Sequence, residues 1–258
     1  MILDRIIEQK KITLAERKRS VTLDRLIEQA RNQQPVRDFA TALTRPGKVN
    51  IIAEAKKASP SKGVIRADFD PVNIARCYET NGAGAVSILT EEHFFQGHID
   101  FLAAVRRSVT IPLLRKDFII DPYQVYEARA AGADALLLIA AVLDSSDLQS
   151  LLQLVQDLGM HALVEVHTED ELEKALKVNP SIIGINNRNL DNFVTDIETT
   201  LRLQALVPDN IITVSESGID TQDDIRRLRD CGVNAFLIGE SLMREPDPGL
   251  KLSQLLDS

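Results

Sequence analysis

Tryptophan is absent from the 258-residue sequence, and other aromatic residues are scarce, with 8 Phe and 3 Tyr. The core of this chain must therefore be aliphatic. The scarcity argues against functions that depend on aromatic cages, base-stacking platforms or membrane-interface belts. It does not argue against a large core, because a chain of this length can bury roughly three quarters of its unfolded surface. One large domain or two small ones would both fit the length.

Basic residues are in the minority, with 30 Lys and Arg against 38 Asp and Glu, for a net charge of -8. This balance argues against nucleic-acid binding, which normally requires a basic face. A small anionic substrate remains compatible with it, because a local cluster of Lys and Arg can oppose the global charge.

Metal, disulfide and membrane signals are also missing. The four His residues have no His-x-x-x-His spacing, and we expect no metal site. Cys77 and Cys231 lie far apart, which predicts two free thiols in a reducing compartment. Charged residues occur throughout residues 1–19, which argues against a signal peptide. No apolar run approaches the roughly 20 residues of a membrane helix. We therefore expect a cytoplasmic protein with no membrane partner.

Short apolar runs recur along the chain, each separated from the next by a polar loop and a segment with helical spacing. Because the runs are β-branched and almost continuously apolar, they predict strands buried on both faces of a parallel sheet. The eight runs cover residues 49–55, 85–89, 111–114, 135–140, 162–166, 182–185, 211–214 and 235–238.

The intervening segments predict helices, because their apolar residues recur at three- and four-residue spacing. Pro71 and Pro122 stand at first-turn positions, and Asp121 is a suitable N-cap. The predicted helices cover residues 71–79, 98–107, 122–130, 144–158, 168–177, 198–206 and 221–229.

Eight strands alternating with helices favour an α/β fold of the closed (β/α)8 TIM-barrel type. An open doubly wound sheet is the alternative, but no Gly-x-Gly-x-x-Gly follows the first strand. Residues 2–9 and 14–29 have helical spacing outside the repeat. They predict an N-terminal helical extension, acting either as a structural cap or in catalysis. We expect a single domain over residues 1–258, with the extension at 1–48 and the barrel at 49–258.

Charged residues stand at the strand ends, where TIM barrels place their chemistry. Glu54 and Lys56 share one face of the first strand, as a structural ion pair or as a functional lysine held by a carboxylate. Arg115 and Lys116 end the third strand, and one of them should point inward unless both are solvated at the rim. A lysine on a desolvated face can have a lowered pKa and serve as a general acid.

The later strand ends suit an acid/base and an anionic ligand. Glu165 lies between two valines, either paired with a lysine or poised with a raised pKa; we expect a pair that also transfers protons. Asn186 and Arg188 suit a polar, anionic ligand. Gly218 and Gly239 would let the backbone approach phosphate oxygens, which predicts a small phosphorylated substrate.

The segments around these residues resemble the indole-3-glycerol phosphate synthase family, from about residue 2 to beyond residue 245. The most specific match is IAEAKKASPSKG at 52–63. The others are SILTEE at 87–92, LRKDF at 114–118, GINNRNL at 184–190, ESGI at 216–219 and FLIG at 236–239.

The resemblance implies a TIM barrel with a helical extension over its mouth. It also implies a carboxy-lyase reaction of tryptophan biosynthesis, in which 1-(2-carboxyphenylamino)-1-deoxyribulose 5-phosphate closes to indole-3-glycerol phosphate with loss of carbon dioxide and water. The family uses no metal or organic cofactor. We expect the chain to act as a monomer or weak homodimer.

The resemblance also implies roles for single residues. Lys116 resembles the general acid that activates the substrate carbonyl, and Glu165 the acid/base of the later proton transfers. Lys56 resembles a second lysine near the substrate carboxylate or phosphate, and Glu54 the carboxylate that orients the lysines. The remaining matches resemble binding residues: Asn186 and Arg188 for the anthranilate part, Phe95, Phe118 and Leu137 for its ring, Ser59, Gly218, Gly239 and Glu240 for the phosphate, and Glu216 and Ser217 for the seventh-strand wall.

Two positions depart from the family pattern. His93 stands where the family often has lysine, and Glu240 where some members have serine. Glu240 would be harmless if its backbone N–H binds phosphate, but not if a hydroxyl is needed. Two rivals remain: phosphoribosylanthranilate isomerase, which uses Cys at the first strand end and an Asp, and a non-catalytic phosphosugar-binding barrel. Neither explains Lys56, Lys116 and Glu165 together.

Overall fold

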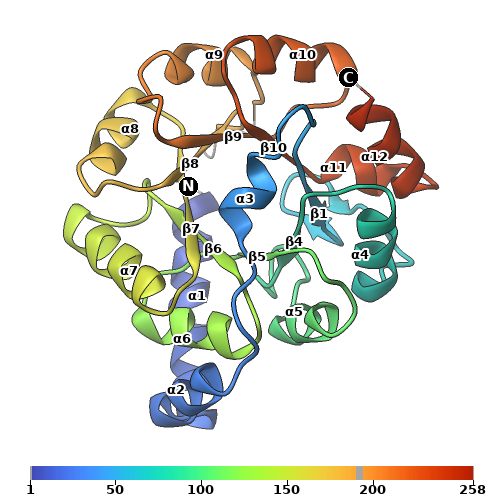
Figure 1. The fold of residues 1–258 in the computed structure, drawn as a ribbon. Coiled ribbons are helices and arrows are strands. Elements are labelled where there is room, and N and C mark those ends of the chain that lie inside the picture. Colours follow the sequence, from blue (N-terminus) through green and yellow to red (C-terminus); the bar gives the residue numbers. More distant parts are fainter. Residues whose placement is uncertain (1, 190–193, 258) are drawn as a thin grey trace.

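The computed structural model describes residues 2–189 and 194–257. Within them, eight parallel strands close into a barrel in the order β1-β10-β9-β8-β7-β6-β5-β4 (Figure 1). This confirms the predicted TIM barrel and excludes the open sheet. The barrel strands are β1 (Ile51–Ala55), β4 (Ala85–Leu89), β5 (Leu113–Lys116), β6 (Ala135–Ile139), β7 (His161–Val166), β8 (Ile182–Asn186), β9 (Ile212–Glu216) and β10 (Ala235–Ile238).

Successive side chains along each strand alternate between an outer core under the helices and an inner core inside the barrel. On β1, Ile51 and Ala53 pack outward under the helices, whereas Ile52 points into the barrel and packs with Leu114 and Leu237. The same alternation turns every second residue near a strand's C-terminal end toward the barrel mouth. Both cores are aliphatic over most of their extent, as the scarcity of aromatic residues requires.

The helices surround the barrel (Figure 1). Three of them begin with an Asp N-cap followed by Pro, at Pro71, Pro122 and Pro248, and the Asp121 cap was predicted. Two helices near the C-terminus were not predicted, and one of these, α12, packs against α4 and closes the ring. The outer helices are α4 (Pro71–Thr80), α5 (Ile99–Arg106), α6 (Pro122–Ala130), α7 (Ser145–Asp157), α8 (Glu169–Leu176), α9 (Glu198–Gln204), α10 (Gln222–Asp230), α11 (Glu240–Arg244) and α12 (Pro248–Leu256).

The N-terminal extension forms three helices, α1 (Ile2–Ser20), α2 (Leu23–Arg31) and α3 (Phe39–Leu43). Helix α1 continues through residues 10–13, where the sequence pattern has a gap. It does so because Lys10 and Thr13, although polar, are buried against the barrel. The break falls instead at Thr22, whose side chain caps α2.

The extension covers both ends of the barrel. Phe39 and Leu43 of α3 are fully buried against the inner core, and the Phe39 ring lies 6.3 Å from that of His161, which begins β7. Figure 1 shows α3 in the middle of the ring of strands. Helix α3 therefore plugs the N-terminal end, whereas Ile2 and Ile6 of α1 line the opposite, functional end.

Buried ion pairs attach α1 to the barrel. Lys10 Nζ lies 2.7 Å from Asp117 Oδ1, and their side chains are 7% and 1% exposed. Arg115 pairs with Asp117 and with Glu127, and Arg17 of α1 reaches the same Glu127. Burial alone would raise the pKa of Asp117, but Lys10 and Arg115 lower it to about 2. The attachment point is thus adjacent in sequence to Lys116.

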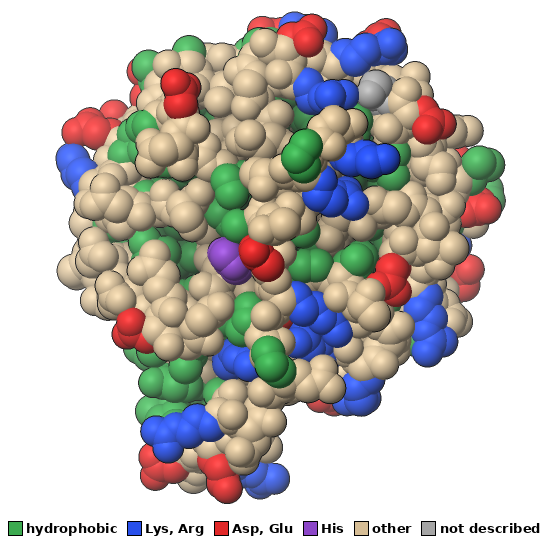
Figure 2. All heavy atoms as spheres, viewed as in Figure 1, with side chains coloured by type: hydrophobic (Ala, Val, Ile, Leu, Met, Phe, Trp, Pro, Cys, Tyr) green, Lys and Arg blue, Asp and Glu red, His purple; other side chains and the backbone are tan. Residues whose placement is uncertain are grey.

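The loop after β1 carries a short antiparallel pair, β2 (Ala58–Ser59) with β3 (Gly63–Val64), which was not predicted. On the face shown in Figure 2, Lys and Arg side chains lie among Asp and Glu side chains rather than in one basic field. No helix in the described part of the chain is both long and apolar enough to cross a membrane.

Candidate active site

The barrel mouth holds two neighbouring hollows that share lining residues. One, of about 880 Å³, is bordered by apolar side chains from α1, β6 and the loops after β4 and β5. The other, of about 960 Å³, lies over the ends of β9 and β10. Glu54, Lys56, Arg188 and Ser217 border both. The mouth can therefore hold one elongated ligand with chemically different ends.

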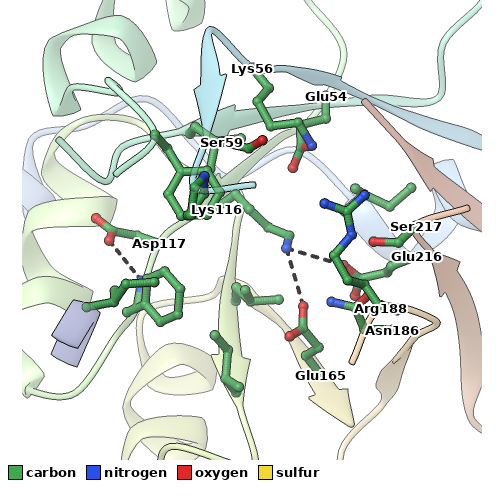
Figure 3. Close-up of a pocket in the computed structure, with 18 of the residues that line it drawn as sticks. Glu54, Lys56, Ser59, Lys116, Asp117, Glu165, Asn186, Arg188, Glu216 and Ser217 are labelled. Carbon is green, nitrogen blue, oxygen red and sulfur yellow. Dashed lines mark hydrogen bonds and ion pairs between the residues drawn. The ribbon is translucent and has the colours of Figure 1, made fainter. Parts of the chain in front are cut away.

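Lys116 borders the apolar hollow, close to Glu54, which borders both hollows. Its Nζ is 3.3 Å from Glu165 Oε2 and 3.4 Å from Glu216 Oε2, and both carboxylates are almost fully buried (Figure 3). The predicted lysine–Glu165 pair is thus present. Arg115, by contrast, points outward and is buried beneath α6 with Glu127. Of the two basic residues that end β5, Lys116 is the one that faces the mouth.

The protonation of Lys116 differs from the expectation. Burial alone would lower the pKa of Lys116, but Glu165, Glu216 and Glu54 outweigh burial and raise it. The pKa of Lys116 is thus raised and not lowered, because three carboxylates from different strands surround the ammonium group. Lys116 is held fully protonated, ready to donate a hydrogen bond or a proton.

The carboxyl group with a raised pKa is Glu216, not Glu165. Burial would raise the pKa of Glu165, but Lys116 and His167 lower it. Burial raises the pKa of Glu216 to about 8, because Lys116 opposes burial only in part and the other carboxylates add to it. Neither Glu216 carboxyl oxygen has a hydrogen-bond partner among the described residues. Gly184 on β8 provides the room, since a Cβ there would collide with Glu216 Oε1.

Glu54 and Lys56 form the predicted ion pair, with Nζ 2.7 Å from Oε2. Burial would raise the pKa of Glu54, but Lys56 and Lys116 lower it. A Cβ on Gly239 would meet the Glu54 carboxylate, so the glycine after β10 makes room for this pair. Glu54 thus joins the two lysines of the mouth electrostatically.

The three apolar residues that the resemblance indicated border the apolar hollow. Phe95 and Phe118 lie with ring centroids 6.3 Å apart, and Leu137 on β6 borders the same space. Ile2 and Ile6 of α1 also border it and were not predicted as site residues. Their only sequence signal was helical spacing, which does not say what a helix covers. The extension therefore contributes to the site as well as capping the barrel.

The polar hollow carries an ion-pair chain. Glu240, the first residue of α11, lies 3.0 Å from the Arg188 guanidinium and 2.5 Å from that of Arg244. The Asn186 side-chain oxygen accepts the backbone N–H of Arg188 at 3.0 Å. The Glu240 side chain thus contacts both arginines, and Glu240 borders the polar hollow.

Backbone and hydroxyl groups complete this hollow. Ser217 and Gly218 follow β9 with φ of +68° and +72°, a conformation that costs a non-glycine residue energy and is typical of functional turns. Ser59 borders the apolar hollow instead, and its buried hydroxyl has no hydrogen-bond partner in the described part of the chain. Such a free polar group is available to a ligand.

Three further residues, His93, His167 and Leu190, remain to be placed relative to the site. His93 lies outside the hollows, with its ring 3.1 Å from the Gln9 amide of α1. His167 was not predicted as a site residue, yet its Nε2 lies 3.4 Å from Glu165 Oε1. Leu190, the last residue of the 184–190 match, lies outside the described residues. Within residues 2–189 and 194–257, no three His, Cys, Asp or Glu side chains gather in a metal-binding arrangement.

Fold and site together define a TIM-barrel enzyme built for acid–base chemistry on an anionic, partly apolar substrate. The family model described as indole-3-glycerol phosphate synthase matches residues 3–255. The chain belongs to this family.

Curated relatives agree with this placement, and a solved structure shares the fold. Proteins named indole-3-glycerol phosphate synthase from Polaromonas naphthalenivorans and Dehalococcoides mccartyi are 50% and 52% identical, over 98% and 99% of this chain and 98% and 100% of their own. The N-acetylmannosamine-6-phosphate 2-epimerase of Clostridium perfringens superposes with a TM-score of 0.63, at 13% identity over 81% of this chain and 92% of its own. That likeness concerns the fold alone.

Proposed function

We propose that the chain converts 1-(2-carboxyphenylamino)-1-deoxyribulose 5-phosphate to indole-3-glycerol phosphate, carbon dioxide and water. It is a carboxy-lyase of tryptophan biosynthesis. The observation that carries the assignment of the site is the position of Lys116, which is paired with Glu165 in the apolar hollow and lies close to Glu54, a residue that the polar hollow shares. The reaction needs an acid, a base, an aromatic pocket and a phosphate site, and each has a counterpart there.

The two hollows fit the two ends of the substrate. The carboxyphenyl ring would lie against Phe95, Phe118 and Leu137. The phosphate would lie over Gly218 and Gly239, accepting hydrogen bonds from backbone N–H groups there and at Glu240. The Ser59 hydroxyl, which borders the neighbouring apolar hollow, would be a further donor. Binding of the phosphate anchors the substrate at a distance from the reacting atoms.

Cations at the border of the hollows suit the substrate carboxylate. The Arg188 guanidinium can form a bidentate contact with it, and Lys56, held by Glu54, supplies a second positive charge. Asn186 fixes the start of the Arg188 loop, whereas Glu216 and Ser217 form the wall at β9. The ring and its reacting carbon are thereby brought toward Lys116.

Ring closure requires an electrophilic carbonyl carbon. The Lys116 ammonium group would donate a proton to the substrate carbonyl oxygen while the ring carbon that bears the carboxylate attacks. The closed ring is then an iminium cation. Its positive nitrogen accepts the electron pair that is released as carbon dioxide leaves.

Dehydration completes the indole. The hydroxyl formed from the carbonyl must leave with a proton, and Lys116 or Lys56 can provide it. Glu165, ionised because Lys116 and His167 lower its pKa, would take the ring proton. Acid and base would thus act from β5 and β7, whose side chains meet inside the mouth.

The two cysteines bear on the compartment of the enzyme and on one rival function. Cys77 and Cys231 are free thiols, as expected in a reducing compartment, and we propose that the enzyme works in the cytoplasm. Neither cysteine lies at a strand end, so the site lacks the cysteine expected of phosphoribosylanthranilate isomerase.

A product assay tests the proposal directly. The purified chain is mixed with saturating substrate in buffer without added metal, and indole emission is followed together with carbon dioxide release. Because the protein contains no Trp, its own emission does not obscure the product. We expect indole and carbon dioxide in equal amounts. No indole product at saturating substrate would overturn the assignment.

A further inference from the structure

A histidine adjoins the proposed base on the side away from Lys116. His167 follows β7 directly and is two residues from Glu165, so both side chains face the barrel interior. His167 Nε2 lies 3.4 Å from Glu165 Oε1, with side chains 9% and 2% exposed. Lys116 approaches the other oxygen, Oε2. The Glu165 carboxylate therefore lies between an ammonium group and an imidazole ring.

The opposite edge of the ring is fixed by α8. Glu171 Oε2 accepts the backbone N–H of His167 at 2.7 Å and lies 3.0 Å from its Nδ1. Because an ionised carboxylate only accepts hydrogen bonds, Nδ1 must carry a proton here. The Thr168 side chain caps α8 at the Glu171 N–H, which holds this turn in place. Ring orientation and the Nδ1 proton are thus set by the fold.

Whether the contact with Glu165 is favourable depends on whether Nε2 of His167 carries a proton. This Nε2 atom is buried and has no hydrogen-bond partner in the described part of the chain. A bare Nε2 lone pair facing an ionised carboxylate would be repulsive, whereas a protonated Nε2 would attract it. The groups that face the ring are Glu165 on β7, Glu171 on α8 and Glu216 on β9. Burial alone would lower the pKa of His167, but these carboxylates raise it.

We propose that His167 is a positioning residue for the reaction: its Nε2–H, with the ring anchored by Glu171, holds Glu165 in place and in its ionised, proton-accepting form. This rests on the proposed function, in which Glu165 is the base. The arrangement Glu171–His167–Glu165 places carboxylate, imidazole and base in sequence, so that loss of the imidazolium charge raises the pKa of Glu165 and removes its anchor without touching the substrate.

The kinetic test compares His167→Gln with His161→Gln. Gln is neutral at every pH, and His161 lies at the other end of β7, near Asp38, where it serves as the matched control. We expect His167→Gln to lower kcat roughly 10- to 100-fold, the effect of one hydrogen bond to a charged group, with KM within about threefold. The acid limb of the kcat–pH profile should move up by about one pH unit, because Glu165 loses a neighbouring positive charge. His161→Gln should keep the wild-type profile.

An unchanged acid limb in His167→Gln overturns the inference, provided that the wild type forms product. If the wild type forms none, the proposed function itself has failed. Should His167→Gln fold poorly, Glu171→Gln provides the second variant, and it should shift the limb in the same direction.

A measurement independent of turnover completes the test. The chain has only four His residues, so the ring protons can be followed by NMR titration in the wild type and in Glu165→Gln. We expect the His167 pKa to lie above the ordinary imidazole value and to fall in Glu165→Gln. A ring that titrates identically in both proteins would overturn the inference.

Discussion

Glu216→Gln should make the enzyme more stable, and increasingly so as the pH rises. The carboxyl group is buried, and its oxygens have no hydrogen-bond partner among the described residues. Lys116 is 3.4 Å away but is also 3.3 Å from Glu165, to which it donates its hydrogen bond. Of the three carboxyl groups in the mouth, Glu216 is the one whose burial is least offset by positive charge, so it retains a proton. Gln has nearly the same shape but no charge.

The magnitude follows from the raised pKa. Burial raises the pKa of Glu216 from 4.5 to about 8. Between these values the unfolded chain has lost the proton while the folded chain keeps it, so the free energy of unfolding falls as pH rises. At pH 7 the loss is about 3 kcal/mol, and above pH 8 it approaches about 5 kcal/mol. Gln at this position does not titrate and escapes this loss.

Urea unfolding at pH 5, 6, 7 and 8, followed by circular dichroism, measures the effect. The stability advantage of Glu216→Gln over the wild type should be small at pH 5 and grow by about 3 kcal/mol or more by pH 8. A difference that stays constant with pH, or one that shrinks as pH rises, would refute the protonated state of Glu216. The wild type would then hold Glu216 as an ionised partner of Lys116.

Two further outcomes follow from the site and its attachment to α1. Glu165→Gln should lower kcat roughly 100- to 10,000-fold with KM changed only a few-fold, measured in the product assay, because it removes the base but not the binding contacts; a loss confined to KM would make Glu165 a binding residue. Lys10→Met should lower the free energy of unfolding in urea by about 2 kcal/mol, because Asp117 keeps Arg115 but loses its other buried cation. The control Lys11→Met, which breaks an exposed pair with Glu8, should lower it by less than about 0.5 kcal/mol. Equal effects of the two Lys variants would contradict the assigned anchor.

The barrel was predictable because each strand is a local signal. The runs at 85–89 and 235–238 coincide with β4 and β10, since apolar residues occupy both faces of those strands. The run at 111–114 ends two residues before β5 does, because the last residues of β5 are the charged Arg115 and Lys116. Apolar runs in the sequence therefore locate buried strands, but they do not reveal the polar residues that end a strand and form a site.

The N-terminal extension shows what local patterns omit. The five residues of α3 are too few for helical spacing to register, and their role as a plug depends on the open barrel end beneath them. The continuation of α1 through Lys10 depends on Asp117, more than a hundred residues away. Both features arise from long-range contacts that a single sequence does not display.

The positions of the site residues at strand ends were predictable, but their protonation was not. Lys116 and Glu165 were expected as a pair, and their side chains do meet. The pKa directions depend on the sum of charges from β1, β7 and β9 in one buried volume. His167 was missed because its importance depends on which way its ring points, and Glu171 fixes that direction.

The role of Lys116 as the proton donor is tested most directly by Lys116→Met, which removes the ammonium group but keeps the length of the side chain. Substrate is titrated into the variant to measure Kd, and indole formation is then followed at saturation. We expect Kd within about tenfold of the wild-type value and turnover lowered at least roughly 1,000-fold, as for loss of a general acid. Turnover within a few-fold of the wild type at saturating substrate would contradict the role of Lys116.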